Sequence, residues 1–131
     1  MKRILIAEDD FYIRDIYARI FINAGYDTTT AFDGKDALDK IRINPIYDML
    51  LLDILMPRMN GIDVLKAIRN LNPPKDQTPV YIISNLGQES IIEEAFQIGL
   101  DGYVIKAQVT PQRIVDEINL FLKKSSKKVV L

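Results

Sequence analysis

Acidic, hydroxyl and basic side chains follow four of the five short apolar runs in this sequence. Glu8-Asp9-Asp10 comes directly after the first run, Asp53 after the third, Ser84 after the fourth and Lys106 after the fifth. Clustered carboxylates repel one another, so they favour the binding of a cation. Because the chain has no His and no Cys, that cation would be a hard ion held by oxygen atoms, with Mg²⁺ the first choice and Mn²⁺ the second.

An aspartate beside such an ion could act as a nucleophile and accept a phosphoryl group. The transfer requires charge to be neutralised on three equatorial oxygens, and Mg²⁺, the Ser84 hydroxyl and the Lys106 ammonium could supply this from three directions. Each residue also has a purely structural explanation. Asp9 or Asp10 could cap a helix, Asp53 could start a turn, and Ser84 and Lys106 could be ordinary surface groups. These explanations do not account for the gathering of all these groups after the apolar runs.

The composition excludes several classes of function. The chain has 131 residues, 48% hydrophobic and 27% charged, which is typical of one globular domain. Its 17 Lys and Arg against 18 Asp and Glu give a net charge of −1, so nothing indicates direct binding to nucleic acid or to an anionic membrane. The lack of His and Cys excludes disulfides, zinc and haem sites and Ser-His or Cys nucleophiles. No apolar run reaches membrane-spanning length, so we expect no membrane insertion and a cytoplasmic location.

The apolar runs alternate with segments of helical period, which predicts five strands and five helices. The predicted strands are residues 4–7, 28–31, 49–52, 80–83 and 102–105. Residues 49–52 are the most apolar and should be central, whereas the polar, β-branched residues 28–31 should lie at an edge. Helix ends are marked by Gly25, Pro45, Pro73-Pro74 and Gly99. The first helix should bury one face formed by Ile13, Ile16, Tyr17, Ile20 and Phe21.

Strands that alternate with helices predict a doubly wound α/β domain, in which a five-stranded parallel sheet has helices on both faces. Ligands of such sheets bind outside the carboxyl ends of the strands, which is where the polar residues fall. We expect the domain to span residues 1–124. Residues 125–131 form a detached tail in this prediction, and its lysines suit the negative end of a helix dipole.

At these residues the sequence resembles the receiver domain of two-component response regulators. The matching pieces are residues 4–10, 53–61, 83–84 and 102–106, in the order and spacing of the family, and the match covers roughly residues 2–124. The resemblance implies a flavodoxin-like (βα)5 fold with strand order 2-1-3-4-5. It agrees with the independent prediction that residues 28–31 form an edge strand.

The resemblance also implies a role for each site residue. Asp53 would be the phosphoacceptor and would share the Mg²⁺ ion with Asp9, a direct ligand. Glu8 would act on the metal mainly through water, and the backbone carbonyl of Leu55 would complete the protein's share of the ligands.

A switch is the second implication of the resemblance. Ser84 would bond the phosphoryl group, Lys106 would pair with it, and Tyr103 would change rotamer as Ser84 is drawn inward. Phosphorylation would then bias the face formed by the fourth helix, fifth strand and fifth helix. The donor would be a sensor histidine kinase or a His-containing phosphotransfer protein, and the output a downstream protein partner or a homodimer. Such a domain is not an enzyme for external substrates, since it catalyses only its own phosphorylation and dephosphorylation.

Three departures from the family pattern carry their own expectations. Ala107 stands where the family usually has Pro after the lysine, and we expect the Lys106–Ala107 bond to be cis so that the lysine still points inward. Asn85 stands where a small residue is usual and could restrict access of the phosphodonor. Leu55 and Leu86, which flank the acceptor, are apolar and cannot orient an attacking water, which predicts a long-lived phosphoaspartate.

Two other functions remain open on the sequence. A dehalogenase-type phosphohydrolase also uses an aspartate nucleophile, but it needs a second Asp two residues later, where this chain has Leu55. A flavin-binding electron carrier could use the same topology. It would need a hydroxyl-rich phosphate loop after the first strand, where Glu8-Asp9-Asp10 would repel the FMN phosphate.

Overall fold

Strands and helices alternate along the chain, as the apolar pattern predicts. The computed structural model describes residues 1–124 and 129–131. The strands are β1 (Arg3–Ala7), β2 (Asp27–Ala31), β3 (Met49–Leu52), β4 (Val80–Ser84), β5 (Gly102–Ile105) and β6 (Val129–Val130). The α-helices are α1 (Phe11–Asn23), α2 (Gly34–Ile43), α3 (Gly61–Arg69), α4 (Glu89–Ile98) and α5 (Pro111–Lys124). Two 3₁₀ turns, η1 (Lys75–Gln77) and η2 (Lys106–Gln108), precede β4 and α5.

The strands form one parallel sheet in the order β2-β1-β3-β4-β5-β6. This confirms the predicted order of the first five strands, with β2 at an edge and the fully buried β3 between β1 and β4. The register is important for the site, because Ala7 lies opposite Leu52 and Ser84 lies opposite Ile105. The residues that follow β1 and β3 therefore leave the sheet side by side, as do those that follow β4 and β5.

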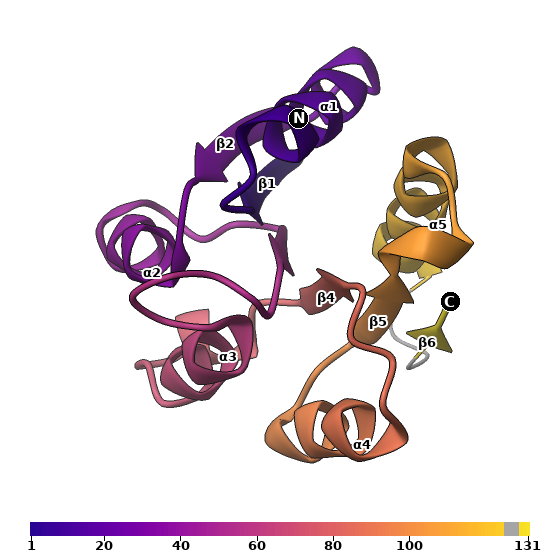
Figure 1. Ribbon diagram of the computed structural model, residues 1–131. Coiled ribbons are helices and arrows are strands. Elements are labelled where there is room, and N and C mark those ends of the chain that lie inside the picture. Colours follow the sequence, from indigo (N-terminus) through magenta and orange to yellow (C-terminus); the bar gives the residue numbers. More distant parts are fainter. Residues whose placement is uncertain (125–128) are drawn as a thin grey trace.

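Helices cover both faces of the sheet, with α1 and α5 on one side and α2, α3 and α4 on the other (Figure 1). The alternation of β1 fits these two layers, since Ile4 and Ile6 pack in the α1–α5 core and Leu5 and Ala7 in the opposite core. Ile16 was predicted to be buried and is instead 49% exposed, because α1 turns Tyr17 and Phe21 toward the sheet. None of the helices in the described residues is both long and apolar enough to cross a membrane.

Residues 129–131 differ from the prediction of a detached tail, whereas residues 125–128, which include the lysines of that prediction, lie outside the described residues. In β6, Val129 lies opposite Gly102 and Val130 opposite Tyr103, and the strand runs parallel to β5. The N–H of Leu131 donates to the carbonyl of Tyr103 (2.9 Å), and the carbonyl of Leu131 accepts from Ile105 (3.2 Å). Valine favours extended backbone, and the outer edge of β5 offers unpaired backbone groups, so even a short segment can add to it.

Candidate functional site

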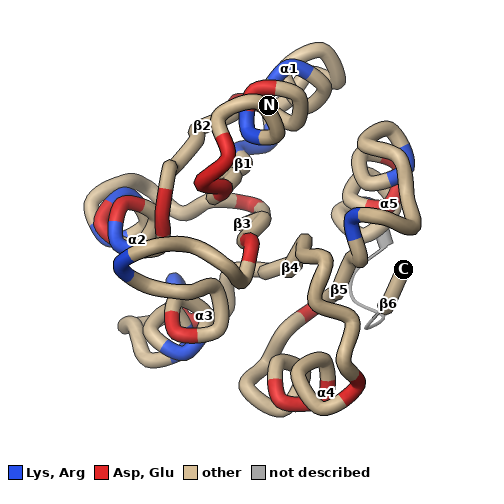
Figure 2. The backbone as a smooth tube through the Cα atoms, viewed as in Figure 1, with Lys and Arg blue, Asp and Glu red and all other residues tan. Residues whose placement is uncertain are grey.

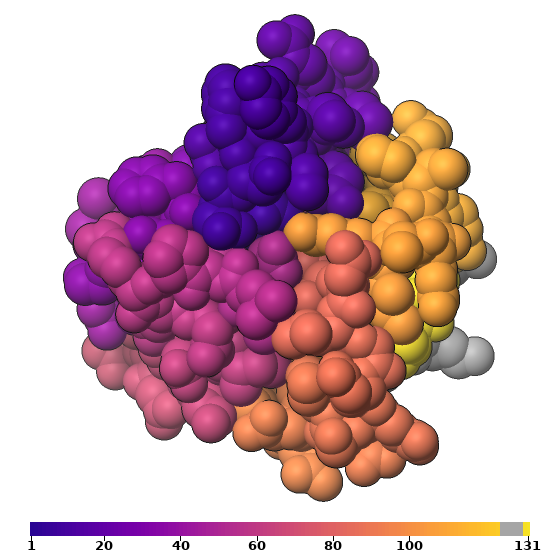
Figure 3. All heavy atoms as spheres, viewed as in Figure 1, coloured from indigo at the N-terminus to yellow at the C-terminus, as the bar shows by residue number. Residues whose placement is uncertain are grey.

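The polar residues singled out in the sequence meet at the carboxyl edge of the sheet. Glu8 follows β1, Asp53 follows β3 and Ser84 ends β4, and all three are buried, with exposed fractions of 3%, 7% and 1%. Acidic segments at the ends of β1 and β3 lie near one another in Figure 2. The space-filling view shows the start of α1, the β3–α3 loop and the start of α5 meeting on one face (Figure 3).

Three carboxylates gather at this edge. Glu8, Asp9 and Asp53 each place an oxygen within 4.8 Å of the other two. Asp9 and Asp53 are therefore close enough to share one ion, as the sequence prediction requires. An all-oxygen donor set in which one carboxylate is exposed suits a hard divalent cation that keeps some of its waters. The part assigned to the Leu55 carbonyl stays a prediction.

The neighbouring carboxylates Asp9 and Asp10 have different surroundings, which settles a choice that the sequence left open. Asp10 is the N-cap of α1, since its Oδ1 accepts a hydrogen bond from the N–H of Ile13 at 3.0 Å. The N–H of Asp10 in turn donates to Glu8 Oε2 at 3.2 Å. With the helix capped by Asp10, the exposed side chain of Asp9 remains at the acidic cluster.

Lys106 supplies the positive charge of the site. Its Nζ donates to Asp53 Oδ2 at 2.8 Å and also to Glu8 Oε1, and its side chain is only 13% exposed. Burial by itself would lower the pKa of Lys106, but the hydrogen bonds to Asp53 and Glu8 raise it above its usual value. The ammonium group therefore stays charged throughout the neutral pH range.

Glu8 has the most perturbed carboxyl group of the cluster. Burial raises the pKa of Glu8 to about 7; the hydrogen bond from Lys106 opposes this shift, and the negative charge of Asp53 adds to it. The charge of the site therefore changes close to neutral pH.

Ser84 and Tyr103 are linked through one residue of the β4–α4 loop. The N–H of Leu86 donates to Ser84 Oγ at 3.2 Å, and the hydroxyl of Tyr103 donates to the carbonyl of Leu86. Tyr103 is fully buried in the core formed with α2, α3 and α4, and burial raises the pKa of its hydroxyl. Leu86 therefore joins Ser84 and Tyr103 by hydrogen bonds from its N–H and to its carbonyl.

The Lys106–Ala107 peptide bond corrects one expectation. We expected it to be cis, but among the described residues the cis bond is Pro73–Pro74. Lys106 instead starts the 3₁₀ turn η2, and the N–H of Ala107 donates to Asn85 Oδ1 at 3.0 Å. That amide hydrogen would not exist in a proline, so the side chain of Asn85 restrains this turn by a contact that the family pattern did not suggest.

The β3–α3 loop closes tightly behind Asp53. The N–H of Gly61 donates to the carbonyl of Ile54 at 2.9 Å. A Cβ atom at Gly61 would lie 2.1 Å from the carbonyl oxygen of Asp53, so only glycine allows the start of α3 to approach Asp53 this closely. This explains the glycine at the end of the motif formed by residues 53–61.

An ion pair beside the site was missed in the sequence. Asp33, the N-cap of α2, is buried and receives two hydrogen bonds from the guanidinium of Arg58 in the β3–α3 loop. Arg58 has φ of 65°, a left-handed conformation that is uncommon for a residue other than glycine. Asp33-Gly34 is typical of a helix start, but nothing in the sequence connects it with a residue 25 positions away.

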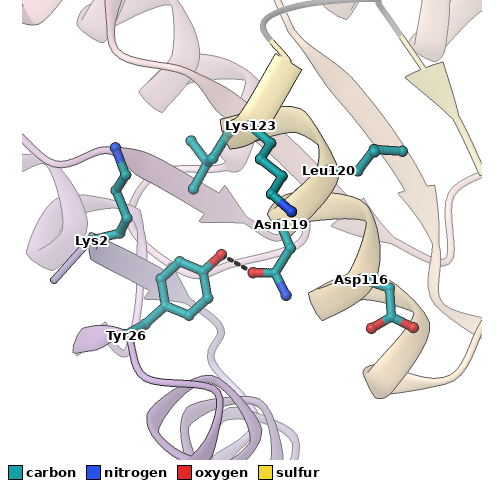
Figure 4. Close-up of a pocket in the computed structure, with 7 residues that line it drawn as sticks. Lys2, Tyr26, Asp116, Asn119, Leu120 and Lys123 are labelled. Carbon is teal, nitrogen blue, oxygen red and sulfur yellow. Dashed lines mark hydrogen bonds between the residues drawn. The ribbon is translucent and has the colours of Figure 1, made fainter.

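A wider hollow lies away from this edge. It has a volume of about 490 Å³ and lies between α5 and the residues at the amino ends of β1 and β2, where the Tyr26 hydroxyl donates to Asn119 Oδ1 (Figure 4). Lys2, Lys123 and Asp116 also line it. Among the described residues that line it, Asp116 is the only acidic one, so we place the candidate site at the acidic edge instead.

This parallel sheet, with an acidic cluster and a lysine at its carboxyl edge, defines a flavodoxin-like domain with a candidate metal and phosphoryl site. Residues 4–119 match the family model of the response regulator receiver domain, and the chain therefore belongs to that family. It is 32% identical over 120 residues to the chemotaxis protein CheY of Thermotoga maritima, a match that covers 90% of this chain and 95% of CheY.

Other relatives carry the same domain within longer chains. The chain is 33% identical over 125 residues to the transcriptional regulatory protein CpxR of Escherichia coli, which covers 95% of this chain but 51% of CpxR. Among solved structures, the receiver domain of the Francisella response regulator 1452 is similar, with a TM-score of 0.84 and 33% identity over 96% of this chain and 100% of that chain.

Proposed function

We propose that this receiver domain accepts a phosphoryl group on Asp53 in a Mg²⁺-dependent reaction. The donor is the phosphohistidine of a sensor histidine kinase or of a His-containing phosphotransfer protein. One observation carries the proposal: Asp53 belongs both to the acidic cluster and to the ion pair with Lys106, whose Nζ lies 2.8 Å from its Oδ2. A carboxylate at that junction can act as the nucleophile while its neighbours neutralise the incoming charge.

The other side chains divide the remaining tasks. Asp9 binds the metal directly, Glu8 acts through water, and the backbone carbonyl of Leu55 completes the set. Mg²⁺, when bound, neutralises charge on the phosphoryl oxygens. Lys106 pairs with the phosphoryl group and the Ser84 hydroxyl donates a hydrogen bond to it.

The proposed switch uses the link through Leu86. When Ser84 Oγ turns to bond the phosphoryl group, its contact with the Leu86 N–H must change, and the Tyr103 hydroxyl bonds the carbonyl of the same residue. Phosphorylation therefore favours one of two arrangements of the α4-β5-α5 face, which binds a downstream protein or a second copy of the chain.

Mass spectrometry with a small acyl-phosphate donor tests the acceptor. We expect a phosphoryl adduct on the wild type with Mg²⁺ and far less in the presence of a chelator. Asp53→Asn should give no adduct, whereas the matched control Asp63→Asn, which changes an exposed aspartate near the start of α3, should behave as wild type. An adduct that persists on Asp53→Asn would overturn the assignment. Turnover of phosphoesters is not expected, because Leu55, exposed and apolar, stands where a hydrolase would need its acid.

A further inference from the structure

Asn85 connects two loops at the edge of the site. It is the first residue after β4, and its Oδ1 accepts the N–H of Ala107 at 3.0 Å across a separation of 22 residues. That N–H belongs to the peptide group between Lys106 and Ala107. The side chain of Asn85 therefore restrains the backbone unit that carries the lysine of the site.

The turn that bears Lys106 has little other support of this kind. η2 is only three residues long, and in the part of the chain that the structure describes no side chain caps its start at Ile105. Short 3₁₀ turns have poorer hydrogen-bond geometry than α-helices, and a lysine side chain has many rotamers. Even so, Lys106 Nζ must reach both Asp53 and Glu8, which it does in this structure.

The end of β4 can place one side chain in the site and the next against the η2 turn, because successive side chains of an extended backbone point to opposite sides. Ser84 is buried (1% exposed) at the end of β4, whereas Asn85 is exposed and reaches the η2 turn. A change in the position of β4 would therefore move the proposed phosphoryl-binding hydroxyl and the support of the lysine together.

We propose that Asn85 is a positioning residue for the phosphorylation of Asp53. It acts through the Ala107 N–H and keeps the Lys106 ammonium against Asp53 and Glu8. The part that concerns reaction rate rests on the proposed function, but the part that concerns the position of Lys106 does not.

The first measurement reads the position of Lys106 without any phosphorylation. Pulsed acylation of amines, followed by peptide mass spectrometry, reports how easily each lysine reacts. In Asn85→Ala we expect Lys106 to be labelled about 3- to 10-fold faster than in the wild type, the range expected when one orienting hydrogen bond is lost. Exposed Lys123 should be unchanged. Asn85→Asp keeps the acceptor oxygen and should restore slow labelling of Lys106.

The second measurement is the rate at which the acyl-phosphate donor modifies the protein with Mg²⁺. Asn85→Ala should slow it by about 3- to 10-fold, while Gln88→Ala, which removes a nearby exposed amide that makes no cap hydrogen bond, should match the wild type. Equal unfolding midpoints of Asn85→Ala and Gln88→Ala would show that the effect is not a general loss of stability.

Each outcome decides a different point. Unchanged labelling of Lys106 in Asn85→Ala overturns the positioning role, whatever the phosphorylation rate does. Faster labelling of Lys106 with an unchanged phosphorylation rate overturns the claim that the placement of Lys106 by Asn85 matters for the reaction. If the wild type forms no adduct at all, the proposed function fails, and the labelling result still stands by itself.

Discussion

Arg58 binds both carboxylate oxygens of Asp33, with Nε 2.6 Å from Oδ2 and Nη2 3.1 Å from Oδ1. The pair joins the β2–α2 loop to the β3–α3 loop that follows Asp53. Asp33 also caps α2 by accepting the N–H of Asp36 at 2.8 Å. The same carboxylate thus stabilises a helix start and holds a loop of the candidate site.

The first prediction concerns the stability of this pair at acid pH. The Arg58 guanidinium lowers the pKa of Asp33 in the folded protein. The stabilisation by the pair is therefore complete above the pKa of Asp33 in the unfolded chain, about 3.9, and it is lost as the pH falls through the pKa of Asp33 in the folded protein. Asp33→Asn keeps a good cap but removes the charge. The difference in free energy of unfolding between wild type and Asp33→Asn should be constant near neutral pH and shrink in strong acid, as measured by denaturant titrations. Asp33→Ala should be less stable than Asp33→Asn by about 1 kcal/mol.

The second prediction concerns Mg²⁺ affinity and Glu8. Because the pKa of Glu8 is raised to about 7, its carboxyl group is protonated below that pH and charged above it. Mg²⁺ should therefore bind more tightly as the pH rises from about 6 to about 8, as measured by calorimetry. Glu8→Gln should remove most of this pH dependence and weaken binding at the higher pH roughly tenfold, a typical effect of an outer-shell group. Glu93→Gln, an exposed change on α4, is the control.

The third prediction concerns the counter-ion of the site. Lys106→Ala leaves Glu8 and Asp53 buried without their ammonium partner and should lower the free energy of unfolding by about 3 kcal/mol. Glu8 can escape part of this penalty by taking up a proton, so the loss should be larger above the pKa of Glu8 than below it. Mg²⁺ should recover part of the stability. Equal losses at acid and alkaline pH would contradict this account.

The fourth prediction concerns the lifetime of the phosphoaspartate. Leu55 is 62% exposed and Leu86 is half-buried, and neither side chain can orient a water molecule. The wild-type adduct should therefore decay slowly. Leu55→Gln should hasten its hydrolysis roughly tenfold, which is a smaller effect than the roughly 10²-fold or greater acceleration that a general base gives. Leu120→Gln changes a leucine of comparable exposure on α5 and should leave the lifetime unchanged. Rapid decay in the wild type would contradict the prediction.

The fifth prediction concerns β6. Removal of residues 129–131 frees the N–H of Ile105, which donates to the Leu131 carbonyl at 3.2 Å. Hydrogen exchange of the Ile105 amide should accelerate. The amide of Leu50, which donates to the Pro79 carbonyl at 2.9 Å in the centre of the sheet, should exchange as in the full chain. If the Ile105 amide exchanges at the same rate in both chains, β6 does not protect it.

Much of the fold follows from local pattern. The apolar run at residues 49–52 lies in the middle of the sheet, because a strand that is buried on both faces requires apolar side chains. The threonines of residues 28–31 lie at the edge, where the strand is only partly buried. Thr110, a residue type that favours helix starts, caps α5, since its hydroxyl accepts the N–H of Arg113 at 3.2 Å. The carboxyl ends of parallel strands share one edge, so the approach of Asp9 to Asp53 could also be predicted.

The structure differs from the sequence prediction where a contact joins residues that are far apart in the sequence, because the local pattern of residue types gives no sign of such contacts. Two valines are too short a segment to predict a strand from the sequence. They form β6 because the outer edge of β5 offers backbone groups with which they can pair. The pairs Asp33–Arg58 and Asn85–Ala107 join loops 25 and 22 residues apart, and each residue alone is typical of an ordinary surface turn. The cis bond expected before Ala107 was wrong because trans is the ordinary form before a residue other than proline, and Lys106 reaches Asp53 without it.

The short strand β6 affects how a reporter should be attached to this protein. The carbonyl of Leu131 accepts from Ile105, the residue before Lys106, so a fluorescent protein joined to that end would leave the fold near the lysine and could hinder the docking of the proposed phosphodonor. Met1 precedes the amino end of β1, at the opposite edge of the sheet. A label placed there would keep the acidic face free for binding measurements.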